Sequence, residues 1–206
     1  MSMKMSETLH WDRGNGMISD ENGDSVARVV DRDVLSLADE WGDADPGLVV
    51  IAPCGSHAGV DPEPSADLLA RWSSDSWEPF NEAMVRAGDL AAEHGTEFVV
   101  LPGAGGRLSD AVCTVSWSAS HSDVGLLLDP VGWLTPSMMR DLEDHLIRFA
   151  SVCGEMPNIW GVVMRSVRMD DSGALVHAPV GEGLVSGELL ERTIGTIPSP
   201  RRILSS

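Results

Sequence analysis

Basic residues are scarce in this chain, and lysine is almost absent. Of its 206 residues, 14 are Lys or Arg and 32 are Asp or Glu, so the formal net charge is −18, and Lys4 is the only lysine. A surface this acidic repels phosphate backbones and anionic lipids, because nucleic-acid affinity comes largely from Lys and Arg that neutralise phosphates. The charge argues against nucleic acid and membrane surfaces as partners.

Cysteine and long apolar runs are also rare. The three cysteines, Cys54, Cys113 and Cys153, are odd in number and lack C-x-x-C spacing, which argues against a disulfide framework or a cysteine zinc site. No run approaches the roughly 18 apolar residues that span a bilayer, and the start of the chain lacks the apolar core of a signal peptide. We therefore expect a cytoplasmic protein.

Short runs of Val, Ile and Leu recur instead, and they predict strands. Four of them are continuously apolar, as in strands that are covered on both faces of a parallel sheet. These four are 48–52, 97–101, 124–128 and 159–164, and weaker candidates are 8–11 and 202–204.

Helical spacing of apolar residues separates these runs. The stretches that show it are 26–41, 80–91, 138–150 and 187–193, whereas 55–76 reads as a long loop and 107–122 as a short helix or a strand. Alternation of strand and helix predicts an α/β protein with parallel strands and right-handed crossovers. We expect one domain over residues 1–206.

Candidate site residues lie just after the predicted strands, because α/β proteins bind ligands beyond the carboxyl ends of parallel strands. Asp129 directly ends the apolar run 124–128, where a carboxylate can bind a hard cation or accept a proton. The alternative is that Asp129 only caps the following turn. A cap of that kind contributes about 1 kcal/mol or less to stability.

Other candidates follow neighbouring runs. Arg165 and Arg168 come after the strand 159–164 and can hold a sugar hydroxyl or a phosphate, or pair with surface carboxylates. His177 is a candidate ligand or proton carrier, or a structural histidine. Cys54 with His57 suggests a thiol nucleophile beside a base, although no third orienting group can be named.

Three segments, taken in order, resemble the xylose isomerase-like TIM barrels, the sugar phosphate isomerase/epimerase superfamily. Residues 81–103 resemble a helix and the following strand of that family, 124–129 resembles the strand that ends in a metal-binding Asp, and 178–190 is similar to its Gly-Glu-Gly segment before a late helix. The resemblance implies a divalent metal (Mn, Mg, Co or Zn) held by Asp129 and proton transfer next to a sugar carbonyl.

The chain also departs from that family. A His commonly follows the metal-binding Asp, where this chain has Gly132 and Trp133, and another expected His is replaced near Met164. A full barrel takes about 250 residues. We therefore predict a reduced or incomplete TIM-like (β/α) barrel with about six parallel strands, and a homodimer that covers the sheet edges.

Three functions are compatible with these features. The first is a divergent sugar isomerase or epimerase that moves a proton next to a sugar carbonyl, with Asp129 and His177 as catalytic residues, Asp129 as metal ligand, and Arg165, Arg168 and His57 binding a small carbohydrate. The second is a non-catalytic binding or assembly subunit that kept the scaffold and lost the metal ligands. The third is a hydrolase that uses Cys54.

Overall fold

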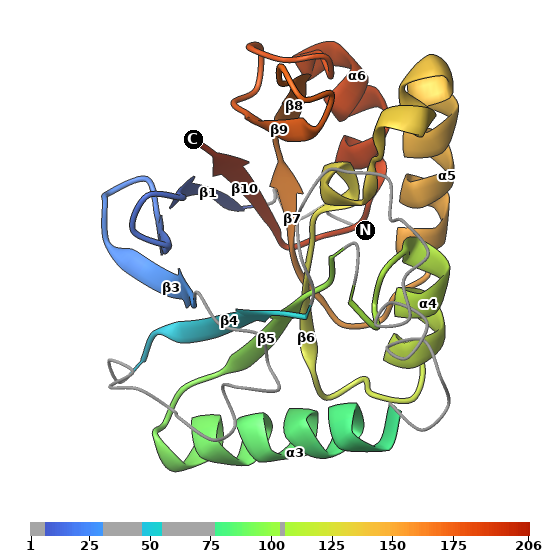
Figure 1. Cartoon of the computed structure of the whole chain (residues 1–206). Coiled ribbons are helices and arrows are strands. Elements are labelled where there is room, and N and C mark those ends of the chain that lie inside the picture. The colour runs from blue at the N-terminus through green and yellow to red at the C-terminus, as the bar shows by residue number, and fades with distance from the viewer. Residues whose placement is uncertain (1–6, 31–46, 55–76, 104–105) are drawn as a thin grey trace, which may run out of the picture.

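The computed structural model describes residues 7–30, 47–54, 77–103 and 106–206 (Figure 1). The strands are β1 (Glu7–Asp12), β2 (Met17–Ser19), β3 (Ser25–Val29), β4 (Val49–Pro53), β5 (Phe98–Leu101), β6 (Gly125–Leu128), β7 (Ile159–Met164), β8 (Ser166–Met169), β9 (Leu175–Ala178) and β10 (Arg201–Ser205). The helices are α3 (Trp77–Glu93), α4 (Ala111–Ser118), α5 (Leu142–Cys153) and α6 (Gly187–Arg192), with short 3₁₀ helices η2 (Pro130–Trp133), η3 (Pro136–Asp141) and η4 (Ile194–Thr196).

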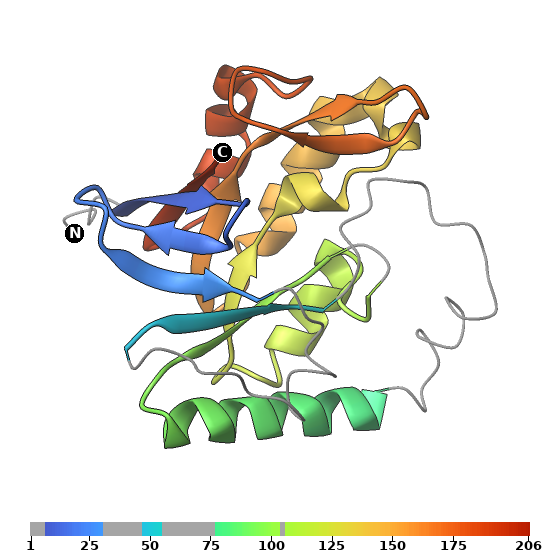
Figure 2. The ribbon, with the colours of Figure 1, turned by 60° about the vertical axis from the view of Figure 1, so that its left-hand side comes forward.

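Eight of these strands close into a barrel in the order β1-β10-β7-β6-β5-β4-β3-β2. In this order, every pair of neighbours from β1–β10 to β4–β3 is parallel. Strand β2 closes the barrel by pairing antiparallel with both β1 and β3. The hairpin of β8 and β9 follows β7 and extends past the carboxyl ends of the parallel strands (Figure 2). We call this end of the barrel the mouth.

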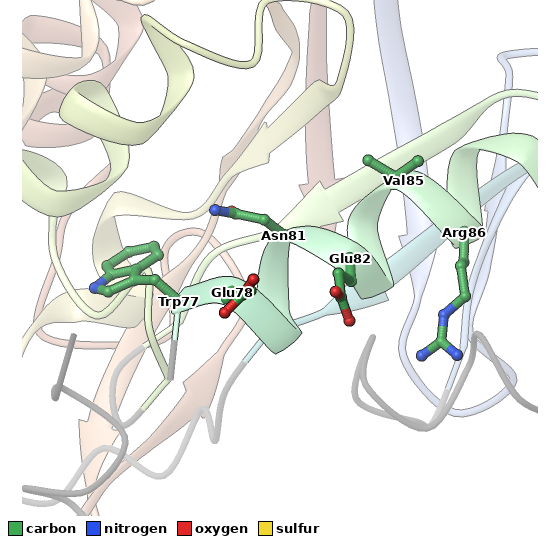
Figure 3. A pocket seen from close by; sticks show the side chains of 6 residues that line it. All are labelled: Trp77, Glu78, Asn81, Glu82, Val85 and Arg86. Carbon is green, nitrogen blue, oxygen red and sulfur yellow. The ribbon is translucent and has the colours of Figure 1, made fainter. Parts of the chain in front are cut away.

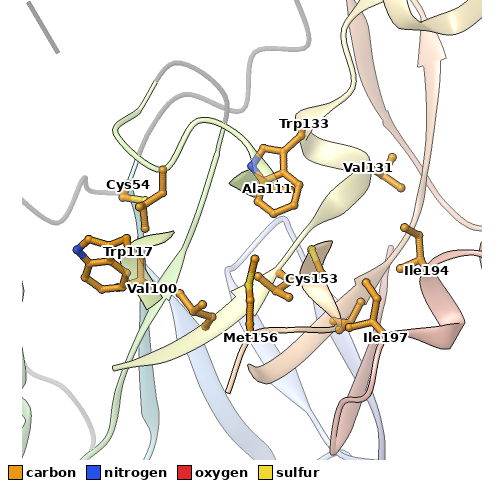
Figure 4. Packing of buried hydrophobic residues seen from close by; sticks show 14 of the residues in the cluster. Cys54, Val100, Ala111, Trp117, Val131, Trp133, Cys153, Met156, Ile194 and Ile197 are labelled. Atoms are coloured by element: carbon orange, nitrogen blue, oxygen red, sulfur yellow. The ribbon is translucent and has the colours of Figure 1, made fainter. Parts of the chain in front are cut away.

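Strand alternation divides the apolar residues into two clusters. One cluster fills the inside of the barrel, and its members alternate along the strands because successive side chains point to opposite faces, with the exception of Trp160 beside the register shift between β6 and β7. Its buried members are Leu9, Trp11, Ile18, Ala27, Ile51, Val99, Leu101, Leu127, Trp160, Val163 and Ile203. The alternate residues face outward and pack under α3 to α6, where Val100, Trp117 and Met156 meet (Figure 4).

The structure confirms the TIM-like α/β barrel and all six predicted strands, but the barrel is closed and has eight strands within the described residues. The homodimer stays a prediction. It was expected because an open sheet leaves edges to cover, and the closed barrel removes that reason.

Some of the predicted helices are confirmed and one is wrong. The stretches 80–91 and 187–193 are confirmed as α3 and α6, the stretch 138–150 is helical but begins as 3₁₀ helix, and 107–122 contains α4. The helix predicted over 26–41 is wrong where the structure describes it, because residues 25–29 form β3, and 31–46 lie outside the described residues. Val26 and Val29 share helical spacing, but the inward residue of this strand is Ala27.

None of the helices within the described ranges is long and apolar enough to cross a membrane. The cytoplasmic location stays a prediction.

The turn between β1 and β2 is held firmly against β3. Gly16 donates its N–H to the carbonyl of Asp12 at 2.9 Å, and its own carbonyl accepts from Val29 N at 2.7 Å. Gly16 has φ +73°, and a β-carbon added there would lie 2.5 Å from the carbonyl oxygen of Val29. Only glycine fits this close approach. The turn therefore fixes the position of Arg13 at the mouth.

We predict that Gly16→Ala destabilises the protein more than Gly23→Ala. Both glycines have positive φ, which costs an L-residue about 1–2 kcal/mol, but nothing lies within 4 Å of a β-carbon at Gly23. Crowding against Val29 should add about 1–3 kcal/mol at Gly16. Urea unfolding of both variants measures the difference, and equal losses would contradict the role given to this contact.

Candidate functional site

A layer of polar side chains lies above the apolar inside of the barrel, at the mouth. Each of these side chains comes two residues after an inward-facing residue of its strand. Because side chains alternate between the two faces of a strand, it also points into the barrel. These residues are Arg13, Asp129, Arg165 and Ser205, which follow Trp11, Leu127, Val163 and Ile203. The four strands involved are parallel neighbours in the barrel order, which brings their carboxyl ends together.

Asp129 and Arg165 form a buried ion pair at the centre of this layer. Arg165 Nε lies 3.0 Å from Asp129 Oδ1 and 2.8 Å from Oδ2, and the two residues are 4% and 0% exposed. Asp129 Oδ1 also accepts from the backbone N–H of Gly132 at 3.0 Å and so caps η2. Asp129 therefore caps the turn and also neutralises a buried arginine.

Gly132 makes room for this pair. A β-carbon at that position would lie 2.8 Å from Asp129 Oδ2 and 3.0 Å from Arg165 Nη2. Any larger residue would push the carboxylate and the guanidinium out of their present geometry. The family that this chain resembles commonly has a histidine near this position. In this chain Gly132 leaves space for the ion pair instead.

Arg13 is the second arginine of the mouth. Its guanidinium carbon lies 4.2 Å from the centre of the Trp11 ring, a cation–π arrangement that holds the side chain in place. Its buried Nε has no hydrogen-bond acceptor among the residues that the structure describes. Burial lowers the pKa of Arg13, the charge of Asp129 raises it and the charge of Arg165 lowers it. Arg13 therefore interacts electrostatically with both residues of the ion pair.

His177 reaches the mouth from the β8–β9 hairpin. Its Nε2 lies 3.1 Å from Ser205 Oγ at the end of β10, and the side chain is half-buried. Burial, and after it the charges of Arg13, Arg165 and Arg168, lowers the pKa of His177 to about 4, and the charge of Asp129 opposes this shift. The imidazole is therefore neutral at pH 7.

The structure brings three of the predicted site residues together and separates the others. Asp129, Arg165 and His177 meet at the mouth, whereas Arg168 is exposed on β8. His57 lies outside the described residues, so the pairing proposed with Cys54 cannot be followed, and Cys54 itself is buried at the end of β4.

Two members of the polar layer, Arg13 and Ser205, were missed by the sequence reasoning. Both follow the weaker predicted strands, 8–11 and 202–204. The signal for both is strand periodicity: Arg13 and Ser205 each lie two residues beyond an apolar residue that faces into the barrel, Trp11 and Ile203.

The residues around Asp129 do not fit a divalent cation. Both carboxylate oxygens already face the guanidinium of Arg165, and a metal at the same oxygens would meet that positive charge. No three His, Cys, Asp or Glu side chains gather at a metal-binding spacing within the described ranges. We therefore derive no chemical step through a metal.

A surface pocket lies on the outer face of α3, away from the polar layer (Figure 3). The opposite face of this helix, with Phe80, Met84 and Ala87, packs toward the barrel. None of the predicted site residues that the structure describes lines the pocket. Its lining residues are Trp77, Glu78, Asn81, Glu82, Val85 and Arg86.

The closed barrel with polar residues at the carboxyl ends of its strands places the chain among the TIM-like barrels. Among solved structures, the chain is similar to the probable 3-DHS dehydratase AsbF, involved in petrobactin synthesis, from Bacillus anthracis. Identity is 10%, the TM-score is 0.52, and the match covers 86% of this chain and 68% of that one. AsbF has a xylose isomerase-like fold, so this likeness supports that fold and no particular activity. No family model and no curated protein matches the sequence.

We predict that Asp129→Asn destabilises the protein by about 3–5 kcal/mol, because it leaves the buried charge of Arg165 without its partner. This corrects the smaller loss expected for a simple turn cap. Asp144→Asn is the matched control: it breaks an exposed pair with Arg148 and should cost about 0.5 kcal/mol or less. Chemical denaturation measures both. A loss for Asp129→Asn as small as the control's would mean that the buried pair contributes little.

We predict that the protein loses stability as the pH falls from 6.5 toward 4, partly through His177. The folded pKa of about 4 lies below the ordinary 6.5, so in this window the unfolded chain binds a proton that the folded chain does not. His177→Gln should therefore show a shallower fall than wild type, while His10→Gln, on an exposed residue of β1, should not. Unfolding at a series of pH values tests this, and parallel curves for wild type and His177→Gln would refute it.

Proposed function

We propose that this chain binds a small carbohydrate or carbohydrate derivative at the mouth of its barrel. The observation that carries the proposal is the polar layer of Arg13, Asp129, Arg165 and Ser205, with His177 beside it, on an otherwise apolar barrel interior. Ligands of TIM barrels bind at this end of the strands. The fold shared with a probable 3-DHS dehydratase adds support for a ligand of this size and polarity.

Binding is better supported than metal-assisted proton transfer. The carboxylate of Asp129 accepts hydrogen bonds from Arg165 and from Gly132 N, so its charge is already paired within the protein. This arrangement favours the second of the three functions set out above, a non-catalytic binding or assembly subunit that kept the scaffold and lost the metal ligands.

Proton transfer by His177 is the second candidate. The imidazole is neutral, half-buried and 3.1 Å from Ser205 Oγ, so it can accept a proton, and its lowered pKa makes it a weaker base than an ordinary histidine. In such a step a ring nitrogen takes the proton from the carbon next to a sugar carbonyl, and the electron pair of the broken C–H bond passes into an enediolate. The imidazolium then returns the proton to the former carbonyl carbon, while the hydroxyl proton moves from one oxygen to the other and the second oxygen becomes the carbonyl.

One NMR experiment in D₂O tests binding and catalysis together. We expect saturation transfer from the protein to members of a panel of aldoses, ketoses, sugar acids and sugar phosphates, and a weaker transfer with His177→Gln than with the control His10→Gln. Deuterium appearing at the carbon next to the carbonyl, and lost in His177→Gln, would favour the isomerase candidate. Absence of saturation transfer from every member of the panel would refute carbohydrate binding.

A further inference from the structure

Among the residues that the structure describes at the mouth, the two arginines Arg13 and Arg165 face the single carboxylate of Asp129, in a protein whose formal net charge is −18. Arg13, Arg165 and Arg168 all act on His177 electrostatically, and Asp129 is the one carboxylate that acts with them among the described residues. Because Asp129 already accepts from Arg165 and Gly132, it balances only one of these arginines. The excess of cations sits where the ligand is proposed to bind.

Arg13 is held in place and has an N–H group available for a hydrogen bond to a ligand. Its guanidinium is stacked on Trp11, and its buried Nε has no acceptor among the residues described. A buried charged donor without an acceptor is costly, and an anionic acceptor removes that cost. Arginine is also suited to planar and tetrahedral oxyanions, because its N–H groups form a fork that matches two oxygens.

The opposite end of the barrel provides an internal comparison. There Arg201 stacks on Trp160 at 4.7 Å, in the same way as Arg13 on Trp11. Arg201 Nε, however, lies 3.4 Å from the carboxylate of Glu7, and its Nη1 donates to the Trp160 carbonyl at 3.3 Å. The indole N–H groups of both tryptophans lack an acceptor among the described residues, so the difference between the two ends lies in the arginines.

We propose that the mouth is an oxyanion site, in which Arg13 donates to a carboxylate or phosphate group of the ligand beside His177 and above the Asp129–Arg165 pair. This inference rests on the proposed function for the rest of the ligand, which is then a sugar acid or a sugar phosphate and not a neutral sugar. Asp129 does not compete for Arg13 because its oxygens are held by Arg165 and Gly132.

Calorimetric titration with matched probes tests the charge of the ligand. The probes are D-glucose, D-glucuronate, D-glucose 6-phosphate, malonate and inorganic phosphate, at a fixed ionic strength so that screening of the acidic surface is constant. We expect the charged probes to bind more tightly than D-glucose. Comparing glucuronate and malonate with glucose 6-phosphate and inorganic phosphate shows whether the group is a carboxylate or a phosphate.

Variants locate the site. Arg13→Gln should weaken the charged probes by about 10- to 100-fold, the range for a lost hydrogen bond to a charged group. Arg201→Gln, which changes the equivalent arginine at the other end, should leave them unchanged. Arg13→Lys keeps the charge without the fork and should fall between wild type and Arg13→Gln. Circular dichroism confirms that each variant is folded before titration.

The outcomes separate this inference from the proposed function. Binding of D-glucose as tight as that of the charged sugars, unaffected by Arg13→Gln, would overturn the oxyanion site and leave carbohydrate binding intact. Arg13-dependent binding of malonate or inorganic phosphate without binding of any sugar would support the oxyanion site and overturn the carbohydrate ligand. Equal weakening by Arg13→Gln and Arg201→Gln, or no binding of any probe, would overturn the oxyanion site.

Discussion

The buried ion pair of Asp129 and Arg165 sets the arrangement of the mouth. It joins the ends of β6 and β7, it caps η2 through Gly132, and it leaves no room for a side chain on that glycine. Charges this deeply buried are tolerated when their geometry and hydrogen bonds are nearly complete. Arg13 and His177 both interact electrostatically with this pair. Because the carboxylate of Asp129 is already paired with Arg165, it neutralises little of the charge of Arg13.

The inside of the barrel has charged groups at both ends and apolar residues between them. At the amino-terminal end Arg201 and Glu7 balance each other, whereas at the mouth two inward arginines share one aspartate. Stability alone would favour balance at both ends, since an unneutralised buried cation is costly. An imbalance limited to the end where TIM barrels bind their ligands is what a site for an anion requires.

The sequence predicts the parallel part of the barrel because continuous apolar runs such as 124–128 and 159–164 identify strands covered on both faces. It fails at β2 and β3, where three and five residues are too few for alternation to stand out from helical spacing. Asp129 was found from its place at a strand end. Its partner Arg165 also follows a predicted strand, but the pairing cannot be predicted, because it depends on the register between β6 and β7, which shifts between Leu126 and Leu127.

The same ion pair explains how a barrel of this fold can hold a ligand without the metal that the family resemblance implies at Asp129. A divalent cation in such a site supplies fixed positive charge beside the ligand. Here the guanidinium of Arg165 takes the position next to the carboxylate, and Arg13 adds a second charge that the carboxylate does not cancel. Positive charge at the mouth is thus provided by side chains, which stabilise a bound anion but do not polarise a carbonyl as a metal does. That difference is why the geometry supports binding more strongly than isomerisation.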